Sequence, residues 1–131
     1  MERTRERLAL AQRALGTLEE LVAVQPASAV VRDAAIQRFE YTFEATWKAA
    51  QIYLREVEGL EIGSPKGTVR LLLQVGVLDE TEARLALAMV DDRNLTVHDY
   101  NEAIAEAIAQ RLAEYARLMR RWLGTMAGRL E

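Results

Sequence analysis

The sequence contains no cysteine, so a disulfide framework and a thiolate metal site are both excluded. It also contains no apolar run close to the roughly 20 residues that a membrane-spanning helix needs. The charged stretch Met1–Arg7 runs straight into a helical pattern and has neither the apolar core nor the cleavage site of a signal peptide. We therefore expect a cytoplasmic protein that makes no contact with a membrane.

Histidine is also scarce, because His98 is the only one in the chain. A metal site would have to be built mainly from carboxylates, and the best-spaced pair is Glu40 and Glu44, one helical turn apart. The same pair is more typical of a solvated helix face on which Glu44 pairs with Lys48. The segment Gly63–Gly67 lacks the spacing of a phosphate-binding loop. We expect neither a metal nor a cofactor.

The chain is weakly acidic, with a formal net charge of −3 over 131 residues. A protein that mainly grips duplex nucleic acid is usually basic, since affinity depends on neutralising phosphates. The charge therefore argues against a general nucleic-acid binder but leaves room for an enzyme with a local basic cleft. The cluster Arg117, Arg120 and Arg121 is typical of a solvated face and could alternatively extend an RNA-contacting surface.

Only two prolines interrupt the chain, Pro26 and Pro65, and both lie at natural breaks between helical patterns. Apolar residues spaced by three and four predict a helix before Pro26 and a second from about Ser28 to Glu58. Ser64 and Pro65 predict the start of a short helix that ends near Gly76. Two acidic capping patterns, at Asp79 and at Asp99, predict two further helices. Their apolar stripes include Leu85, Ala86, Met89 and Val90 in one, and Ile104, Ile108, Leu112, Tyr115, Met119, Trp122 and Met126 in the other.

These patterns predict an all-α protein, an antiparallel up-and-down four-helix bundle with a short extra helix, in which residues 1–131 form a single domain. Phe43 and Trp47 belong to the expected core. Four apolar residues, Leu10, Val24, Leu118 and Leu123, extend the stripes of the first and last helices. A wider internal stripe would explain them, and so would a second subunit packed against them.

The run from Arg93 to Asp99 is predicted to be a loop between two helices, and its composition is unusual for a bundle loop. His98 can accept or donate a proton near neutral pH, and Arg93 can neutralise a phosphate. Asn94 adds a neutral hydrogen-bonding group, and Tyr100 places a hydroxyl at the start of the last helix. Together they suggest metal-free cleavage of a phosphodiester. The alternative is structural: His98 is an ordinary surface or cap residue, Arg93 pairs with Asp91 or Asp92, and Tyr100 packs.

The single histidine has a consequence for that chemistry. Acid–base cleavage of RNA works best with two proton-transfer groups on opposite sides of the phosphate. A two-fold dimer that brings both His98 side chains to one cleft would supply the pair. We therefore expect a homodimer.

Two stretches resemble the nucleotidyltransferase substrate-binding proteins, the small helical partners in HEPN/MNT gene pairs. One is Gln37–Lys48, with its Phe-Glu-x-x-Phe-Glu-x-x-Trp-Lys pattern, and the other is the Arg-Asn-x3-His-x-Tyr motif of residues 93–100. Ser64-Pro65-Lys66 and the spacing onward are also similar, so that the resemblance covers about Leu8 to Met119.

The resemblance implies a HEPN-like helical bundle that forms a two-fold dimer. It implies that Arg93 and His98 are the catalytic residues of a metal-independent endoribonuclease, a HepT-like toxin with an RNA substrate, and that Asn94 supports them. It also implies an MNT-type nucleotidyltransferase antitoxin as partner and Tyr100 as the hydroxyl to which that partner attaches AMP. The alternative within the same family is a non-catalytic subunit that presents substrate to a nucleotidyltransferase.

Overall fold

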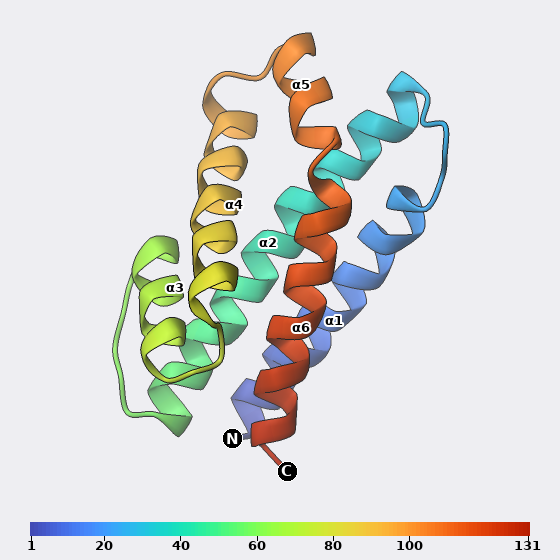
Figure 1. Ribbon diagram of the computed structural model, residues 1–131. Helices are drawn as coiled ribbons and strands as arrows, with labels where there is room; N and C mark the ends of the chain where they lie inside the picture. Colours follow the sequence, from blue (N-terminus) through green and yellow to red (C-terminus); the bar gives the residue numbers. More distant parts are fainter.

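The computed structural model describes residues 1–131 as six helices without a β-strand (Figure 1). The helices are α1 (Glu2–Val22), α2 (Ala29–Val57), α3 (Pro65–Gln74), α4 (Glu80–His98), α5 (Glu102–Ala109) and α6 (Leu112–Arg129). Helices α1, α2 and α4 run up, down and up, and α5 and α6 together form the fourth, descending rod (Figure 1). The short α3 packs beside α4. The all-α four-helix bundle with a short extra helix is thus confirmed. No helix is both long and apolar enough to cross a membrane.

Three predicted helix starts are confirmed by their caps. The Ser28 hydroxyl accepts a hydrogen bond from the Val31 N–H at 3.1 Å, and the Ser64 hydroxyl accepts one from the Gly67 N–H at 3.1 Å. Asp79 and Glu82 form a reciprocal capping box with bonds of 2.8 and 2.9 Å. Each cap satisfies N–H groups that have no partner within the helix.

The core takes side chains from all six helices, and its largest fully buried members lie on α2 and α6. Phe39 of α2 stacks on Tyr115 of α6 with ring centroids 5.6 Å apart. Phe43 is buried as predicted, whereas Trp47 is only partly buried against the core. This packing holds the middle of α2 against α4 and α6, which fixes the position of the carboxyl end of α4.

The four apolar residues outside the narrow stripes divide into two kinds. Leu118 and Leu123 are fully buried within the bundle, so a wider internal stripe explains them. Leu10 and Val24 remain 43% and 44% exposed. Of these four residues, only Leu10 and Val24 are therefore available for contact with another molecule.

The prediction that Arg93 to Asp99 forms a loop is wrong, because α4 continues through His98. The run contains no glycine or proline to stop the helix. Leu95 packs against the core, and Thr96 is buried with its hydroxyl bonded to the Arg93 carbonyl oxygen at 2.7 Å. Tertiary packing thus extends the helix by almost two turns through the polar motif.

Two details of the last predicted helix also differ. Asp99 is the C-cap of α4, and the next helix is capped by Asn101, whose side chain accepts from the Ile104 N–H at 3.0 Å. The helix itself is broken at Gln110 and Arg111, between α5 and α6. No glycine or proline marks this break. It coincides with the point where the Arg111 side chain bonds to Asp92 of α4.

Candidate functional site

The candidate residues gather at the carboxyl end of α4 and in the link to α5. Asn94 and His98 are one turn apart and share a face of α4. Arg93 and His98 are five residues apart, which separates them by about 140° around the helix and about 7.5 Å along it. The structure therefore brings Asn94 and His98 together, and it turns Arg93 toward a different side of the helix.

Arg93 is held against α2. Its Nη2 atom lies 3.1 Å from Oε2 of Glu44, and its guanidinium carbon lies 5.8 Å from the centre of the Phe43 ring. Lys48 pairs with the same carboxylate at 3.3 Å, as the spacing predicted. The Arg93 side chain keeps 30% of its surface exposed, so a ligand could still contact it.

The alternative pairing of Arg93 with Asp91 or Asp92 is wrong. Asp91 instead contacts Lys66 of α3 at 2.7 Å, and Asp92 contacts Arg111. Glu44 was considered above as a metal ligand with Glu40. In the structure it belongs to the ion pairs with Arg93 and Lys48, and no group of three or more side chains is arranged to hold a metal ion.

His98 is exposed in the last turn of α4. Its side chain takes part in no hydrogen bond or ion pair, so it plays no capping role of the kind considered in the structural alternative. The ring is free to meet a ligand.

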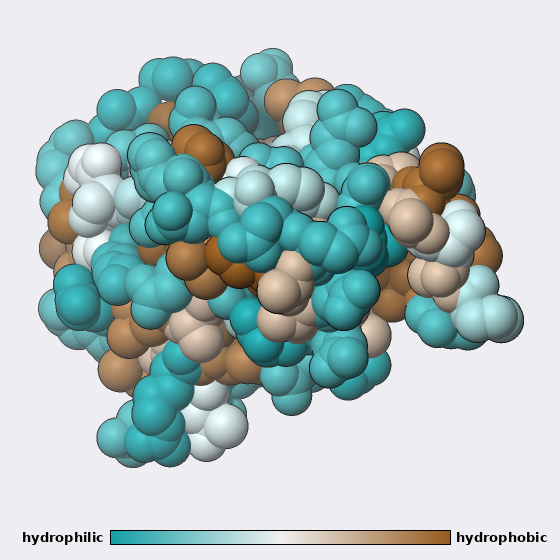
Figure 2. Space-filling model, turned by 90° about the horizontal axis from the view of Figure 1, so that it is seen from above, coloured by the Kyte–Doolittle hydropathy of each residue, from teal (hydrophilic) through white to brown (hydrophobic).

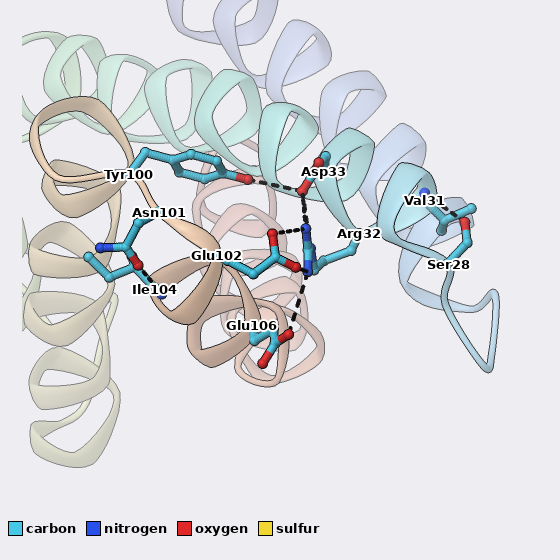
Figure 3. A network of polar contacts seen from close by, with 9 residues as sticks. All are labelled: Ser28, Val31, Arg32, Asp33, Tyr100, Asn101, Glu102, Ile104 and Glu106. Atoms are coloured by element: carbon cyan, nitrogen blue, oxygen red, sulfur yellow. Dashed lines mark hydrogen bonds and ion pairs between the residues drawn. The ribbon is translucent and has the colours of Figure 1, made fainter.

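Tyr100 belongs to a polar network that joins the starts of α2 and α5 (Figure 3). Its hydroxyl donates to Oδ1 of Asp33 at 3.0 Å. Arg32 binds the same Asp33 at 3.0 Å and reaches across to Glu102 at 2.7 Å. The Arg32 guanidinium is only 12% exposed and lowers the pKa of the Glu102 carboxyl.

Partial burial and the hydrogen bond to Asp33 together raise the pKa of the Tyr100 phenol, burial being the larger cause. The Tyr100 side chain is nevertheless 47% exposed. Its hydroxyl is therefore accessible, protonated at neutral pH, and hydrogen-bonded to a carboxylate that can accept its proton. Asp33 was not identified from the sequence, because its role depends on a contact across 67 positions.

A second polar cluster lies on the buried side of α4, around Asp92. Asp92 is 6% exposed and accepts two bonds from Arg111, at 2.7 and 2.8 Å, and one from the Tyr115 hydroxyl. Burial and the neighbouring Asp92 raise the pKa of the Tyr115 phenol. This Asp92 cluster ties α4, one residue before Arg93, to the α5–α6 break.

The raised pKa of Tyr115 predicts a loss of stability in alkali. The unfolded phenol ionises near pH 10, whereas the folded phenol stays protonated to a higher pH. Its contribution is complete below about pH 10 and is lost as the pH rises toward the folded pKa. The free energy of unfolding of the wild type should therefore fall more steeply above pH 10 than that of Tyr115→Phe. Urea titrations at several pH values measure this, and parallel curves would contradict it.

Most of the clustered arginines of α6 form ion pairs with neighbouring helices. Arg120 pairs with Glu19 of α1, and Arg121 pairs with Glu82 of α4 at 3.0 Å. Arg117 is exposed and has no such partner. Most of this cluster is therefore neutralised by carboxylates from neighbouring helices, which leaves little charge for a nucleic acid.

Figure 2 shows the end of the molecule that carries the α4–α5 link. Hydrophilic residues cover most of this end, and apolar groups are visible only in separate patches between them. The exposed apolar side chains of the link are Val97 and Tyr100. This end of the molecule is thus predominantly polar.

The family whose sequence pattern matches residues 6–128 is described as nucleotidyltransferase substrate binding protein like. That match covers nearly the whole chain. The chain belongs to this family. Among curated proteins, none is similar enough in sequence to count as a relative.

Solved structures are consistent with this membership. A protein of Thermus thermophilus is 64% identical over 88% of this chain and 98% of its own, with a TM-score of 0.85. A mutant of the toxin–antitoxin complex MntA-HpeT is 16% identical over 98% of this chain and 99% of its own, with a TM-score of 0.80. A tri-AMPylated HEPN toxin of Shewanella oneidensis in complex with an MNT antitoxin is 16% identical, covers 95% and 96%, and gives 0.78. Because the last two structures are only 16% identical to this chain, they show only that the chain has the HEPN-like fold.

Proposed function

We propose that this protein is a HEPN-type, metal-independent endoribonuclease, the toxin of a toxin–antitoxin pair controlled by a cognate minimal nucleotidyltransferase. The observation that carries the proposal is the exposed, unpaired His98 on the same face as Asn94. Arg93 and Tyr100 lie close to it in the chain, at the same end of α4. The His98 imidazole takes part in no packing contact that would account for it, and the Arg93 side chain keeps 30% of its surface exposed.

The proposed chemistry needs three groups. A base removes the proton from the ribose 2′-oxygen, which attacks the adjacent phosphorus, and an acid protonates the departing 5′-oxygen. Histidine is the residue type most often used for such proton transfers, and His98 is the only histidine in the chain. Arg93 is suited to the charge on the phosphate oxygens, and Asn94 to hydrogen bonding beside it. No step requires a metal ion.

The course of α4 gives the dimer an additional role. Within one helix, Arg93 and His98 point about 140° apart, so one protomer does not aim both at the same phosphate. A two-fold homodimer could pair Arg93 of one protomer with His98 of the other and also place two histidines about one cleft. We therefore propose that the active form is the homodimer.

The partner is proposed from the structural neighbours. Several solved toxin–antitoxin complexes contain a chain with this fold, and one is described as an AMPylated HEPN toxin bound to an MNT antitoxin. By analogy, we propose that an MNT-type nucleotidyltransferase attaches AMP to Tyr100. The Asp33 carboxylate would then accept the phenolic proton while the oxygen bonds to the α-phosphorus and pyrophosphate leaves.

If the partner attaches AMP to Tyr100, the mass of the chain should increase. Incubation with the cognate nucleotidyltransferase and ATP should add the mass of AMP to the wild-type chain and add nothing at this position in Tyr100→Phe. Asp33→Asn should slow the addition by about tenfold or more, since it removes the proton acceptor. Intact-mass and peptide mass spectrometry measure both effects.

Tyr41→Phe is the matched control, because Tyr41 is 58% exposed and lies on α2 away from the motif. It should accept AMP at the wild-type rate. If an active partner leaves Tyr100 unmodified, or if modification persists undiminished in Tyr100→Phe, the model of control by AMP is wrong.

A second candidate function follows from the family description, which refers to substrate binding by a partner of a nucleotidyltransferase. The ion pair of Arg93 with Glu44 fits this interpretation, because a guanidinium neutralised by a carboxylate binds phosphate less strongly. Incubation of the purified chain with single-stranded RNA and EDTA separates the two. Cleavage that persists in EDTA and depends on His98 supports the nuclease. A stable complex with the nucleotidyltransferase and no cleavage under any condition supports the binding subunit.

A further inference from the structure

A cavity lies between α1 and α2, apart from the residues that carry the proposed chemistry. It encloses about 420 Å³, within the range of small-ligand pockets. Its lining contains two arginines, one glutamine, one threonine, one tyrosine and one alanine: Arg13, Ala14, Thr17, Gln37, Arg38 and Tyr41. We call it the α1–α2 groove.

Neither arginine of the groove has an acidic partner, and the two lie together in one cavity. Arg32, Arg93, Arg111, Arg120, Arg121 and Arg129 all form ion pairs with carboxylates. Arg13 and Arg38 form none, both are exposed, and no acidic residue lines the groove. In a protein of net charge −3, two uncompensated cations in one cavity form a local positive site.

The other lining residues suit a nucleic acid strand better than a simple anion. Tyr41 is 58% exposed, so its ring can stack on an unpaired base beside the two cations. Gln37 and Thr17 offer hydrogen-bonding groups within the same cavity. Cations that track phosphates, combined with an aromatic platform, are the usual features of a surface that binds single-stranded nucleic acid.

The groove also adjoins the candidate site. Gln37 lines both the α1–α2 groove and a neighbouring groove formed by residues of α2 and α4, which includes Thr96 and Tyr100. That second groove contains Asp33 and Glu40, whose negative charges disfavour phosphates. A strand that continues from the end of α4 past Gln37 would reach Arg13 and Arg38.

We propose that the α1–α2 groove binds the backbone of single-stranded RNA, with Arg13 and Arg38 contacting phosphates and Tyr41 stacking on a base. The inference rests on the proposed ribonuclease function and extends it by giving the substrate a second contact away from the reacting phosphate. The groove takes no part in the chemical step.

The test measures binding and cleavage separately. Binding of a fluorescently labelled single-stranded oligoribonucleotide is followed by anisotropy in the His98→Ala chain, so that cleavage does not interfere, over a series of salt concentrations. Adding Arg13→Gln and Arg38→Gln together should weaken binding at least about tenfold. It should also reduce the slope of log K against log salt by about 1.4, since each lost phosphate contact with a single strand accounts for about 0.7. Tyr41→Ala should weaken binding by about tenfold with little change in slope.

Arg117→Gln is the matched control, because it removes one exposed, unpaired arginine from α6. It should leave the affinity within about twofold of the reference chain, as one charge far from the strand contributes little. In chains that keep His98, the paired groove substitutions should raise the KM for RNA and leave kcat unchanged. A loss with Arg117→Gln as large as that of Arg13→Gln or Arg38→Gln alone would mean that binding follows overall charge, and the proposal would be wrong.

Other outcomes also overturn the proposal. If the groove variant keeps its RNA affinity and binds the nucleotidyltransferase less tightly, the groove docks an acidic protein surface. If light scattering shows a changed oligomeric state, the groove is an interface between copies of this chain. RNA binding through the groove without cleavage by the wild type contradicts only the nuclease proposal. Cleavage with unaltered KM in the groove variant contradicts only this inference.

Discussion

His98→Ala is expected to lower the rate of RNA cleavage at least about 100-fold and to leave the fold intact. General acid–base catalysis by a positioned side chain typically contributes about 10²- to 10⁴-fold. His98 is exposed and forms no side-chain contact that the helix needs, so the change in unfolding free energy should stay within about 0.5 kcal/mol. Cleavage rates and thermal melting followed by circular dichroism measure the two effects on the same sample.

Arg93→Ala is expected to abolish cleavage as well, but this variant also loses the contacts with Glu44 and Phe43. A folding defect could therefore mimic a catalytic one. Arg84→Ala is a suitable control for both variants, because Arg84 is exposed on α4 away from the motif. It should cleave at the wild-type rate. Cleavage that survives both His98→Ala and Arg93→Ala would exclude the proposed site.

A mixing experiment tests whether the site is shared between protomers. If each site takes Arg93 from one chain and His98 from the other, a mixed dimer of the two inactive variants contains one intact site and one doubly defective site. If one His98 suffices at each site, an equimolar, fully exchanged mixture should then recover roughly a quarter of the wild-type activity, whereas a site that needs both histidines as acid and base would stay inactive in the mixture. If each site lies within a single protomer, the mixture should stay inactive. The geometry of α4 favours recovery.

Asp92→Ala is expected to destabilise the fold by about 2–3 kcal/mol, because it leaves the buried Tyr115 hydroxyl without an acceptor, whereas the 43% exposed Arg111 side chain stays in contact with water. Small domains have a total stability of about 5–15 kcal/mol, so this variant should unfold at a clearly lower urea concentration than the wild type. Tyr115→Phe removes only one bond and should cost about 1–2 kcal/mol. Urea denaturation measures each free energy.

The adjacent residue provides the matched control. Asp91 also pairs with a cation, Lys66, at 2.7 Å, but its side chain is 62% exposed. Asp91→Ala should therefore cost no more than about 1 kcal/mol. If Asp91→Ala and Asp92→Ala destabilise equally, the burial of Asp92 does not give its contacts the importance that we assign to them.

The helices were predictable because their signals are local. The stripe of Phe39 and Phe43 and the caps at Ser28, Ser64 and Asp79 each depend on residues within a few positions of one another, so the sequence alone is sufficient. The start of α5 could not be predicted in the same way, because Asp99 and Asn101 are both suitable N-cap residues. The one that is used depends on where α4 ends, and that is set by Leu95 and Thr96 packing against the bundle.

The motif itself was also identified from the sequence, since Arg93, Asn94, His98 and Tyr100 stand out by residue type. Only the tertiary structure decided how they are presented. It continued α4 through His98, which turns Arg93 away from His98, and it paired Arg93 with Glu44 across 49 positions and Tyr100 with Asp33 across 67. Local patterns carry no information about which distant carboxylate meets an arginine, because that depends on how whole helices pack. The sequence thus determined the helices and the chemical groups, and packing determined their directions and partners.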